Sequence, residues 1–253
     1  MGNKFENQVA LVTGGASGIG RATALAFSEA GAQVVVSDVD IAGGQKTVEL
    51  IKAAGGAATF VAADVTQAAD VEALIAETIE TYGRLDCAFN NAGIAGEVGA
   101  TVDCTEENWD RVIDINLKGV WLCMKYEIPH MLEQGGGAIV NTASAAGTVA
   151  LPGLPAYTAS KHGVIGLTRN AAVEYAKEGI RVNAVSPGSI LTPFATGLMG
   201  DDPEVIEEEG ALHPIGRMGS PEEVAQAVLW LCSDDASFVT AHPMAVDGGL
   251  VAL

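Results

Sequence analysis

The first 90 residues alternate between short apolar runs and helical patterns, and this alternation constrains the fold more than any other feature. Each apolar run is followed by glycine, aspartate or asparagine and then by a segment suited to a helix. The predicted strands are residues 9–13, 33–37, 58–63 and 85–89. No hairpin signal separates them, so consecutive strands should run parallel, with crossover helices on both faces. The sequence therefore predicts an α/β fold with a doubly wound, mostly parallel sheet.

The rest of the chain continues this pattern without a repeat or a linker, which predicts one domain over residues 1–253. Ser220 and Pro221 provide an N-cap and a first-turn proline for the last helix. The further elements expected are helices at 105–131, 155–177 and 220–232 and strands at 138–142, 181–186 and 244–246. Residues 189–219 are rich in glycine and proline and show no sustained apolar periodicity. They form either a lid over the substrate or a plain connecting loop.

Charge and cysteine usage exclude several classes of partner. Thirteen basic residues stand against 32 acidic ones, for a formal charge of −19, which should repel nucleic acid and anionic membrane surfaces. The four cysteines and four histidines are scattered without metal-ligand spacing, so we expect neither a disulfide framework nor a bound metal. Residues 1–8 are polar and no apolar run is long enough to span a bilayer. These features favour a cytoplasmic protein.

Two features near the ends of the first strands suggest a nucleotide site. Residues 13–20, T-G-G-A-S-G-I-G, join a strand to a helix, where backbone N–H groups can bind a pyrophosphate. Their spacing differs from G-x-G-x-x-G, and a turn needed only for packing is the alternative. Asp38 follows the second strand, where it could accept hydrogen bonds from ribose hydroxyls and repel a 2′-phosphate, or cap the next helix. Asp64 could contact adenine or form a turn.

Tyr157 and Lys161 form a candidate proton-transfer pair. A spacing of four places them on one face of the helix predicted from Pro155. An unperturbed tyrosine has a pKa near 10, and an ammonium about 4 Å away could stabilise its phenolate by roughly 4 kcal/mol. Such a tyrosine can exchange a proton at neutral pH. The same spacing occurs on many helices as a core ring beside an exposed amine, so the pair needs support from other motifs.

From Phe5 to its C-terminus the chain resembles the short-chain dehydrogenase/reductase family, in its branch of about 250 residues. One motif of this kind proves little, but many in the family's order leave coincidence negligible. The matching positions are Thr13–Gly20, Asp64 with Val65, Asn90-Asn91-Ala92-Gly93, Asn116, Ser144, Tyr157, Lys161, Pro187-Gly188 and Thr192. The resemblance implies a single Rossmann-type domain.

The resemblance also implies catalytic roles. Tyr157 transfers the proton to or from the substrate oxygen, and Ser144 hydrogen-bonds the same oxygen. Lys161 lowers the pKa of the phenol and binds the nicotinamide ribose. Asn116 kinks its helix and holds a water that joins Lys161 to solvent. No metal is required, because hydrogen bonds polarise the carbonyl.

By the same resemblance, the cofactor contacts come from the ends of several strands and from the catalytic helix. They are Gly14, Ser17, Gly18, Ile19, Gly20, Asp38, Asp64, Val65, Asn90, Asn91, Ala92, Gly93, Tyr157, Lys161, Pro187, Gly188, Ile190 and Thr192. The substrate pocket is expected to be mostly apolar and without a cation to bind a carboxylate. Its residues are Ser144, Ala146, Leu154, Tyr157, Phe194 and Met199.

Together these features predict an NAD(H)-dependent oxidoreductase that interconverts a secondary alcohol and a ketone. A 3-oxoacyl-thioester reductase of the same family is one alternative, although the acidic surface should repel an acidic carrier protein. A non-catalytic dinucleotide-binding protein is another, and the presence of Ser144, Tyr157 and Lys161 argues against it. The resemblance further implies a homotetramer formed by pairing the long helices at 105–131 and 155–177.

Overall fold

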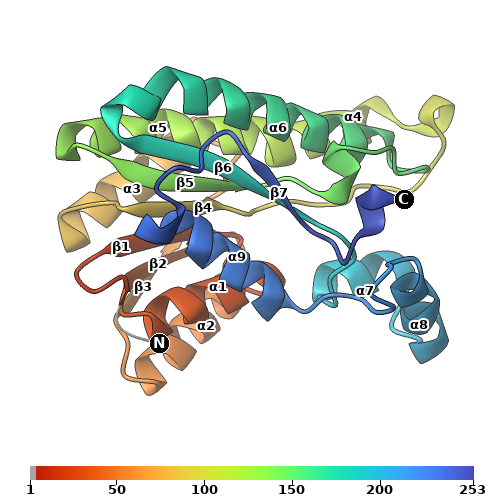
Figure 1. The fold of residues 1–253 in the computed structure, drawn as a ribbon, viewed down its shortest axis with the longest axis horizontal. Helices are drawn as coiled ribbons and strands as arrows, with labels where there is room; N and C mark the ends of the chain where they lie inside the picture. Colours follow the sequence, from red (N-terminus) through yellow and green to blue (C-terminus); the bar gives the residue numbers. More distant parts are fainter. Residues whose placement is uncertain (1–3) are drawn as a thin grey trace.

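The computed structural model describes residues 4–253, which form one sheet of seven parallel strands in the order β3-β2-β1-β4-β5-β6-β7 (Figure 1). The strands are β1 Val9–Thr13, β2 Gln33–Asp38, β3 Ala58–Ala62, β4 Cys87–Asn90, β5 Gly137–Thr142, β6 Ile180–Pro187 and β7 Pro243–Val246. Every strand pair is parallel. The predicted doubly wound α/β fold is confirmed.

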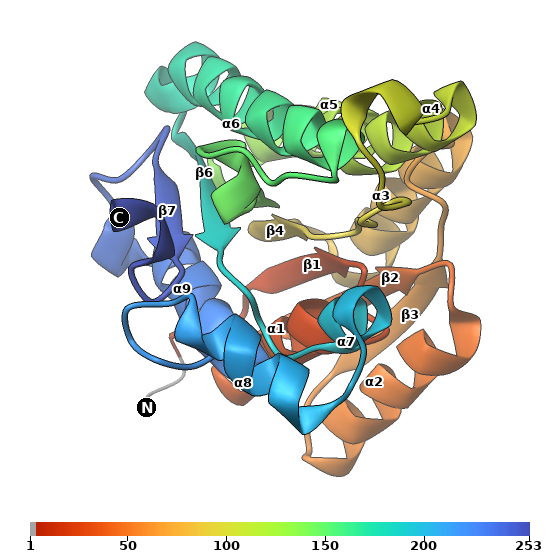
Figure 2. The same ribbon diagram turned by 90° about the vertical axis from the view of Figure 1, so that its right-hand side faces the viewer.

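Helices cover both faces of the sheet, and each face buries its own apolar cluster (Figure 2). The main helices are α1 Gly18–Glu29, α2 Ile41–Ala53, α3 Ala68–Tyr82, α4 Glu106–Ile113, α5 Gly119–Gln134, α6 Pro155–Tyr175 and α9 Pro221–Cys232. Leu11 of β1 belongs to the cluster under α3, α5 and α6, whereas its neighbour Val12 belongs to the cluster under α1, α2 and α9. Between residues 4 and 253, no helix has both the length and the apolar character required to cross a membrane.

The long helix expected at 105–131 is two α-helices joined by a π-helical turn at Asp114–Lys118. A π-helical turn holds one extra residue and is often found at functional sites. Here it contains Asn116, which is fully buried. The interruption agrees with the kink that the family resemblance implied at this residue.

Residues 189–219, where the sequence shows no sustained apolar periodicity, contain two short helices, α7 Pro193–Met199 and α8 Pro203–Ala211. Thr192 and Asp202 cap these helices by accepting hydrogen bonds from backbone N–H groups, and a proline follows each cap. Helices of seven and nine residues are too short to show a sustained apolar period. In the sequence, these two helices are indicated by a capping residue followed by proline, Thr192-Pro193 and Asp202-Pro203.

A row of buried polar side chains links α5 to α6 across β4 and β5. Asn90 Nδ2 donates to Glu127 Oε2 at 3.1 Å and to Asn141 Oδ1 at 3.0 Å. Asn141 Nδ2 in turn donates to Thr168 Oγ1 at 3.0 Å. Burial raises the pKa of Glu127 to about 8, so its carboxyl group is mostly protonated at neutral pH. This row fixes the ends of the two central strands from which the site residues project.

We expect Glu127→Gln to become more stable relative to wild type as the pH rises. The folded-state pKa of Glu127 is raised from 4.5 to about 8, so its stabilising contribution is complete below pH 4.5 and is lost as the pH rises to about 8. Glutamine stays neutral throughout. The difference in unfolding free energy should therefore shift towards the variant by up to about 1.4 kcal/mol per pH unit within that window, as measured by urea denaturation.

The exposed Glu133 on the same helix provides a matched control, because Glu133→Gln should show no such pH-dependent difference. A stability difference between Glu127→Gln and wild type that stays constant from about pH 5 to about pH 8 would contradict a protonated Glu127.

Candidate active site

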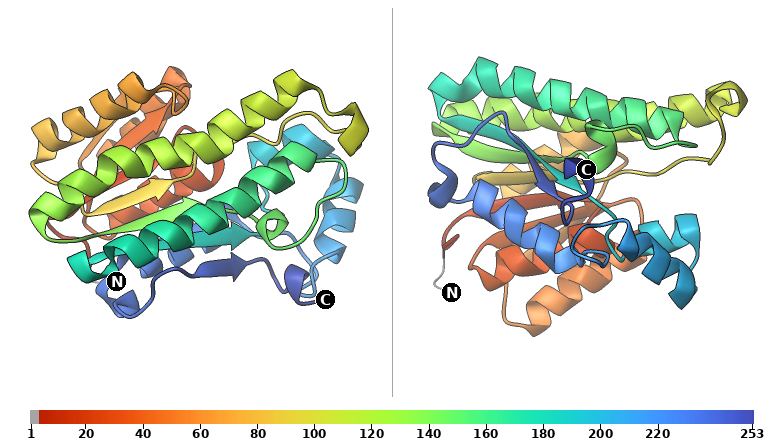
Figure 3. Two further views of the ribbon diagram at one scale, coloured as in Figure 1. Left: turned by 90° about the horizontal axis from the view of Figure 1, so that it is seen from above. Right: turned by 45° about the vertical axis from the view of Figure 1, so that its right-hand side comes forward.

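The carboxyl ends of the strands open onto one cavity of about 970 Å³. Most of the predicted site residues line it, although they are spread over almost the whole chain. They are Gly14, Ser17, Gly18, Ile19, Asp38, Asp64, Val65, Asn91, Ala92, Gly93, Ser144, Ala146, Leu154, Tyr157, Lys161, Pro187, Gly188, Ile190, Thr192, Phe194 and Met199. Figure 3 shows α6 on one side of the sheet and α7 on the other.

Three predicted residues, Gly20, Asn90 and Asn116, lie outside the cavity wall. A Cβ atom at Gly20 would lie 2.0 Å from the carbonyl oxygen of Gly14, so this glycine lets α1 pack against the turn. Asn90 belongs to the buried row beneath the sheet. The Asn116 amide bridges both backbone polar groups of Ile94 at 2.8 Å and contacts Ser160 Oγ at 3.2 Å. These residues support the site through their neighbours.

The turn before α1 fits a pyrophosphate. Gly14 has a φ of +64°, and a Cβ there would come within 2.8 Å of Asn91 Nδ2, so only glycine is accommodated. The N-cap residue Ser17 makes no side-chain cap, and the first turn of α1 holds no acidic residue. The N–H groups at this helix end therefore remain available to an anion.

Asp38 lies at the side of the cavity formed by β2 and β3. Its Oδ2 accepts from the N–H of Ala16 and its Oδ1 from that of Asp40, both at 2.9 Å. The alternative role for Asp38, capping the next helix, belongs to Asp40, whose side chain accepts from Gly43 N. Ser37 Oγ, also at the cavity wall, is buried without a partner among the described residues, which marks a place for a polar ligand atom.

The predicted catalytic residues Ser144, Tyr157 and Lys161 lie where β5 ends and α6 begins. Lys161 Nζ donates to the carbonyl oxygen of Thr142 at 2.8 Å and lies 5.5 Å from the ring centroid of Tyr157. Burial lowers the pKa of Lys161 to about 8. Burial also raises the pKa of Tyr157, and its hydrogen bond with Ser144 opposes that rise.

Burial has the largest effect on the Tyr157 pKa in this structure and raises it, so the lowering expected from Lys161 stays a prediction. The ammonium lies over the ring, and one of its hydrogen bonds goes to Thr142, so the desolvation of the phenol dominates its pKa. Thr142 itself was missed in the sequence. Its contribution is a backbone carbonyl, which every residue has, so no residue type could have identified it.

The part of the cavity next to Tyr157 is mainly apolar. The ring of Phe194, on α7, lies 6.2 Å from that of Tyr157, centroid to centroid. The other apolar side chains on this side are Ile94, Val98, Val149, Leu151, Leu154, Leu198, Met199, Leu212 and Leu250. Met199, on α7, was predicted from the sequence, whereas Leu212, just after α8, and Leu250, near the C-terminus, were not. The segment 189–219 thus covers the cavity, and its role as a moving lid stays a prediction.

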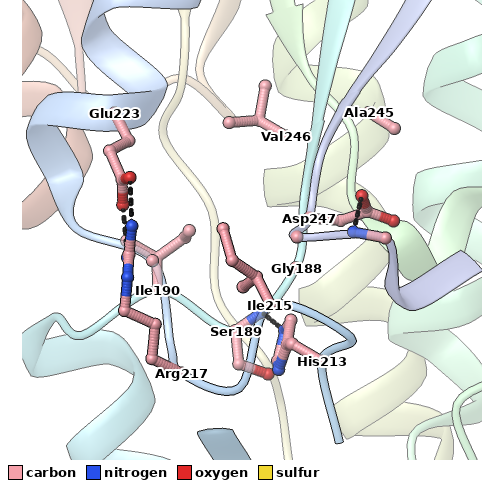
Figure 4. A pocket seen from close by; sticks show the side chains of 13 residues that line it. Gly188, Ser189, Ile190, His213, Ile215, Arg217, Glu223, Ala245, Val246 and Asp247 are labelled. Carbon is pink, nitrogen blue, oxygen red and sulfur yellow. Dashed lines mark hydrogen bonds and ion pairs between the residues drawn. The ribbon is translucent and has the colours of Figure 1, made fainter.

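A second pocket of about 340 Å³ is lined on one side by the segment Gly188–Ile190 (Figure 4). The polar side chains that line it already have hydrogen-bond partners within the protein. Arg217 pairs with Glu223 at 2.7 Å, and Asp247 accepts from the N–H groups of Gly249 and Val251. His213 Nε2 accepts from the N–H of Ser189 at 3.0 Å. These bonds fix the loop that follows β6 rather than offering free groups to a ligand.

The chain matches known proteins over nearly its full length. A family model described as enoyl-(acyl carrier protein) reductase covers residues 14–251. A cyclohexanol dehydrogenase of Acinetobacter sp. is 50% identical over 248 residues, which are 98% of this chain and 96% of the relative. A cis-4-hydroxycyclohexanecarboxylate dehydrogenase of Sinomonas cyclohexanicum is 46% identical over 253 residues, covering 100% of both chains.

A solved structure shows the same likeness in three dimensions. The crystal structure of levodione reductase superposes with a TM-score of 0.95 at 42% identity, covering 98% of this chain and 99% of the other. The sequence motifs, the parallel sheet and the Ser144, Tyr157 and Lys161 group agree with these matches. This chain belongs to the short-chain dehydrogenase/reductase family.

Proposed function

We propose that this protein is an NAD(H)-dependent dehydrogenase that interconverts a six-membered-ring secondary alcohol and its ketone. The observation that carries this proposal is the placement of Ser144, Tyr157 and Lys161 in one cavity beside an apolar wall. The relatives named for cyclohexanol and for a hydroxycyclohexane acid point to the same substrate class.

Each of the cavity residues has a distinct role in the proposed reaction. A bound nicotinamide supplies or accepts the hydride. The Tyr157 hydroxyl exchanges a proton with the substrate oxygen, and the Ser144 hydroxyl hydrogen-bonds the same oxygen. Lys161, with a pKa of about 8, is mostly protonated at neutral pH and favours the phenolate form when the proton leaves Tyr157. The apolar wall excludes water and strengthens these interactions.

The residues around Asp38 support NAD rather than NADP. The carboxylate of Asp38 is held at the ribose side of the cavity and would repel a 2′-phosphate. Of the described residues lining the cavity, Lys161 alone is basic. Arg21, which starts close by on α1, donates to Thr47 and to the carbonyl oxygens of Ala16 and Gly43.

A thioester reductase is the second candidate, because the matching family model is described by an acyl-carrier-protein substrate. The apolar wall without a free cation and the formal charge of −19 favour a small neutral alcohol. Measuring kcat/KM with NADH for a 3-oxoacyl thioester and for cyclohexanone distinguishes the two functions. The ring ketone should be reduced more efficiently.

The proposed homotetramer is supported by apolar side chains exposed on α4, α5 and α6. Trp109 and Trp121 are 41% and 45% exposed, and Val173 is 78% exposed. Helices α5 and α6 lie side by side on the outside of the same face of the sheet (Figure 1, Figure 3). Pairing these helices with a second copy would cover the exposed rings.

We expect Tyr157→Phe to lower turnover by about 10²- to 10⁴-fold while leaving NADH binding nearly intact, because only the exchanging proton is lost. Steady-state kinetics with cyclohexanol and a fluorescence titration of NADH measure the two effects. Tyr126→Phe, in a partly buried tyrosine outside the cavity, should keep wild-type turnover. Wild-type turnover in Tyr157→Phe would show that another residue carries the proton.

We expect wild-type kcat/KM with NAD to exceed that with NADP, and Asp38→Asn to narrow this preference by about tenfold or more through loss of the repelling charge. Asp40→Asn is the control, since asparagine also caps helices and this residue does not line the cavity. Equal efficiency with both cofactors in the wild type would refute the assignment of Asp38.

Light scattering at micromolar concentration should give about four times the 25.8 kDa of one chain. A charged residue on the proposed interface, as in Trp109→Glu, should dissociate the assembly, because its carboxylate would be buried and no basic residue lies three or four positions away on α4 to pair with it. A mass near that of one chain for the wild type rules out the tetramer.

A further inference from the structure

Glu209, on α8, is a carboxylate at the substrate side of the cavity. Three carboxylates line the cavity among the described residues: Asp38, Asp64 and Glu209. Asp38 and Asp64 follow β2 and β3, at one edge of the sheet, and belong to the proposed adenosine side. Glu209 bonds to Ser189, which follows β6, on the other side of the middle strand β4. It therefore lies on the same side as Ser144, which follows β5.

The Glu209 side chain is held in place by its neighbours. Ser189 Oγ donates to Glu209 Oε1. The Nε2 atom of His213 accepts from Ser189 N, so its Nδ1 carries the proton and donates to the Glu209 carbonyl oxygen at 3.1 Å. Figure 4 shows His213 beside Ser189. One imidazole thus fixes both ends of the Ser189–Glu209 contact.

One oxygen of this carboxylate remains available. Glu209 Oε2 makes no hydrogen bond to any described residue, and it is not among the buried atoms that lack a partner. Apolar residues, among them Leu212 and Leu250, line the same cavity. A carboxylate oxygen at the wall of such a cavity binds a hydroxyl donor and opposes a second negative charge.

We infer that Glu209 determines substrate specificity: it favours a ring alcohol that carries a second hydroxyl group and disfavours one that carries a carboxylate. The inference rests on the proposed function and narrows it. The second hydroxyl donates to Glu209 Oε2 while the reacting hydroxyl meets Ser144 and Tyr157. An anionic ring acid brings like charges together, and no free cation at the cavity wall offsets the repulsion.

The test compares three ring alcohols with NAD: cyclohexanol, 1,4-cyclohexanediol and 4-hydroxycyclohexanecarboxylate. For the wild type we expect kcat/KM to be highest for the diol, after correction for its two hydroxyls, and lowest for the acid. Glu209→Gln keeps an acceptor for Ser189 but removes the charge. It should lower the diol-to-cyclohexanol ratio and raise the acid-to-cyclohexanol ratio, each by about tenfold. Glu208→Gln, an exposed neighbour on the same helix, should leave both ratios unchanged.

The outcomes distinguish this inference from the function on which it rests. If the wild type oxidises cyclohexanol but uses the acid as efficiently as the diol, the inference on Glu209 is overturned and the proposed function stands. Ratios that agree within twofold between Glu209→Gln and the wild type also overturn it. If no ring alcohol is oxidised, the proposed function fails and the inference fails with it. The wild-type comparison is decisive even where Glu209→Gln does not fold.

Discussion

All seven strands run parallel, so their carboxyl ends lie along one edge of the sheet, and every functional side chain depends on this constraint. Residues as distant in sequence as Gly14, Asn91, Ser144 and Gly188 meet there because each follows a strand. The strands are buried on both faces, so their register is fixed by packing. The position of the site therefore follows from the packing of helices on both faces of these apolar strands.

The charge of Lys161 is the most demanding feature of the site, because removing an ammonium from water costs several kcal/mol unless hydrogen bonds replace the lost solvent. The Thr142 carbonyl provides one such bond at 2.8 Å. Thr142 directly follows Asn141, whose side chain is bonded to Asn90 and Thr168 in the buried row that ends at Glu127. A protonated carboxyl group under the sheet thus helps to fix the strand end that accepts the hydrogen bond from Lys161.

The cavity is divided into two chemical halves. The half beneath β2 and β3 offers Asp38, Asp64 and the N–H groups of α1, which suit a dinucleotide. The half beyond β5 is mainly apolar, with Ser144, Tyr157, Lys161 and the Ser189–Glu209 pair as its principal polar groups. The relatives include dehydrogenases named for a neutral alcohol and for a ring acid. Of the described cavity residues on α7 and α8, Glu209 alone is charged.

The order of the strands and of most helices, the glycine turn, and the Ser144, Tyr157 and Lys161 group could be predicted from the sequence. These features depend on residue type and on spacing along the chain. The groups that surround each of them are set by tertiary packing. Glu127 looks like a surface residue in its helix, yet it is fully buried, and the burial that raises the Tyr157 pKa comes from distant segments. Likewise, no local pattern brings Glu209 to Ser189 or the Thr142 carbonyl to Lys161. Burial and hydrogen-bond partners depend on long-range packing, and local sequence periodicity does not encode them.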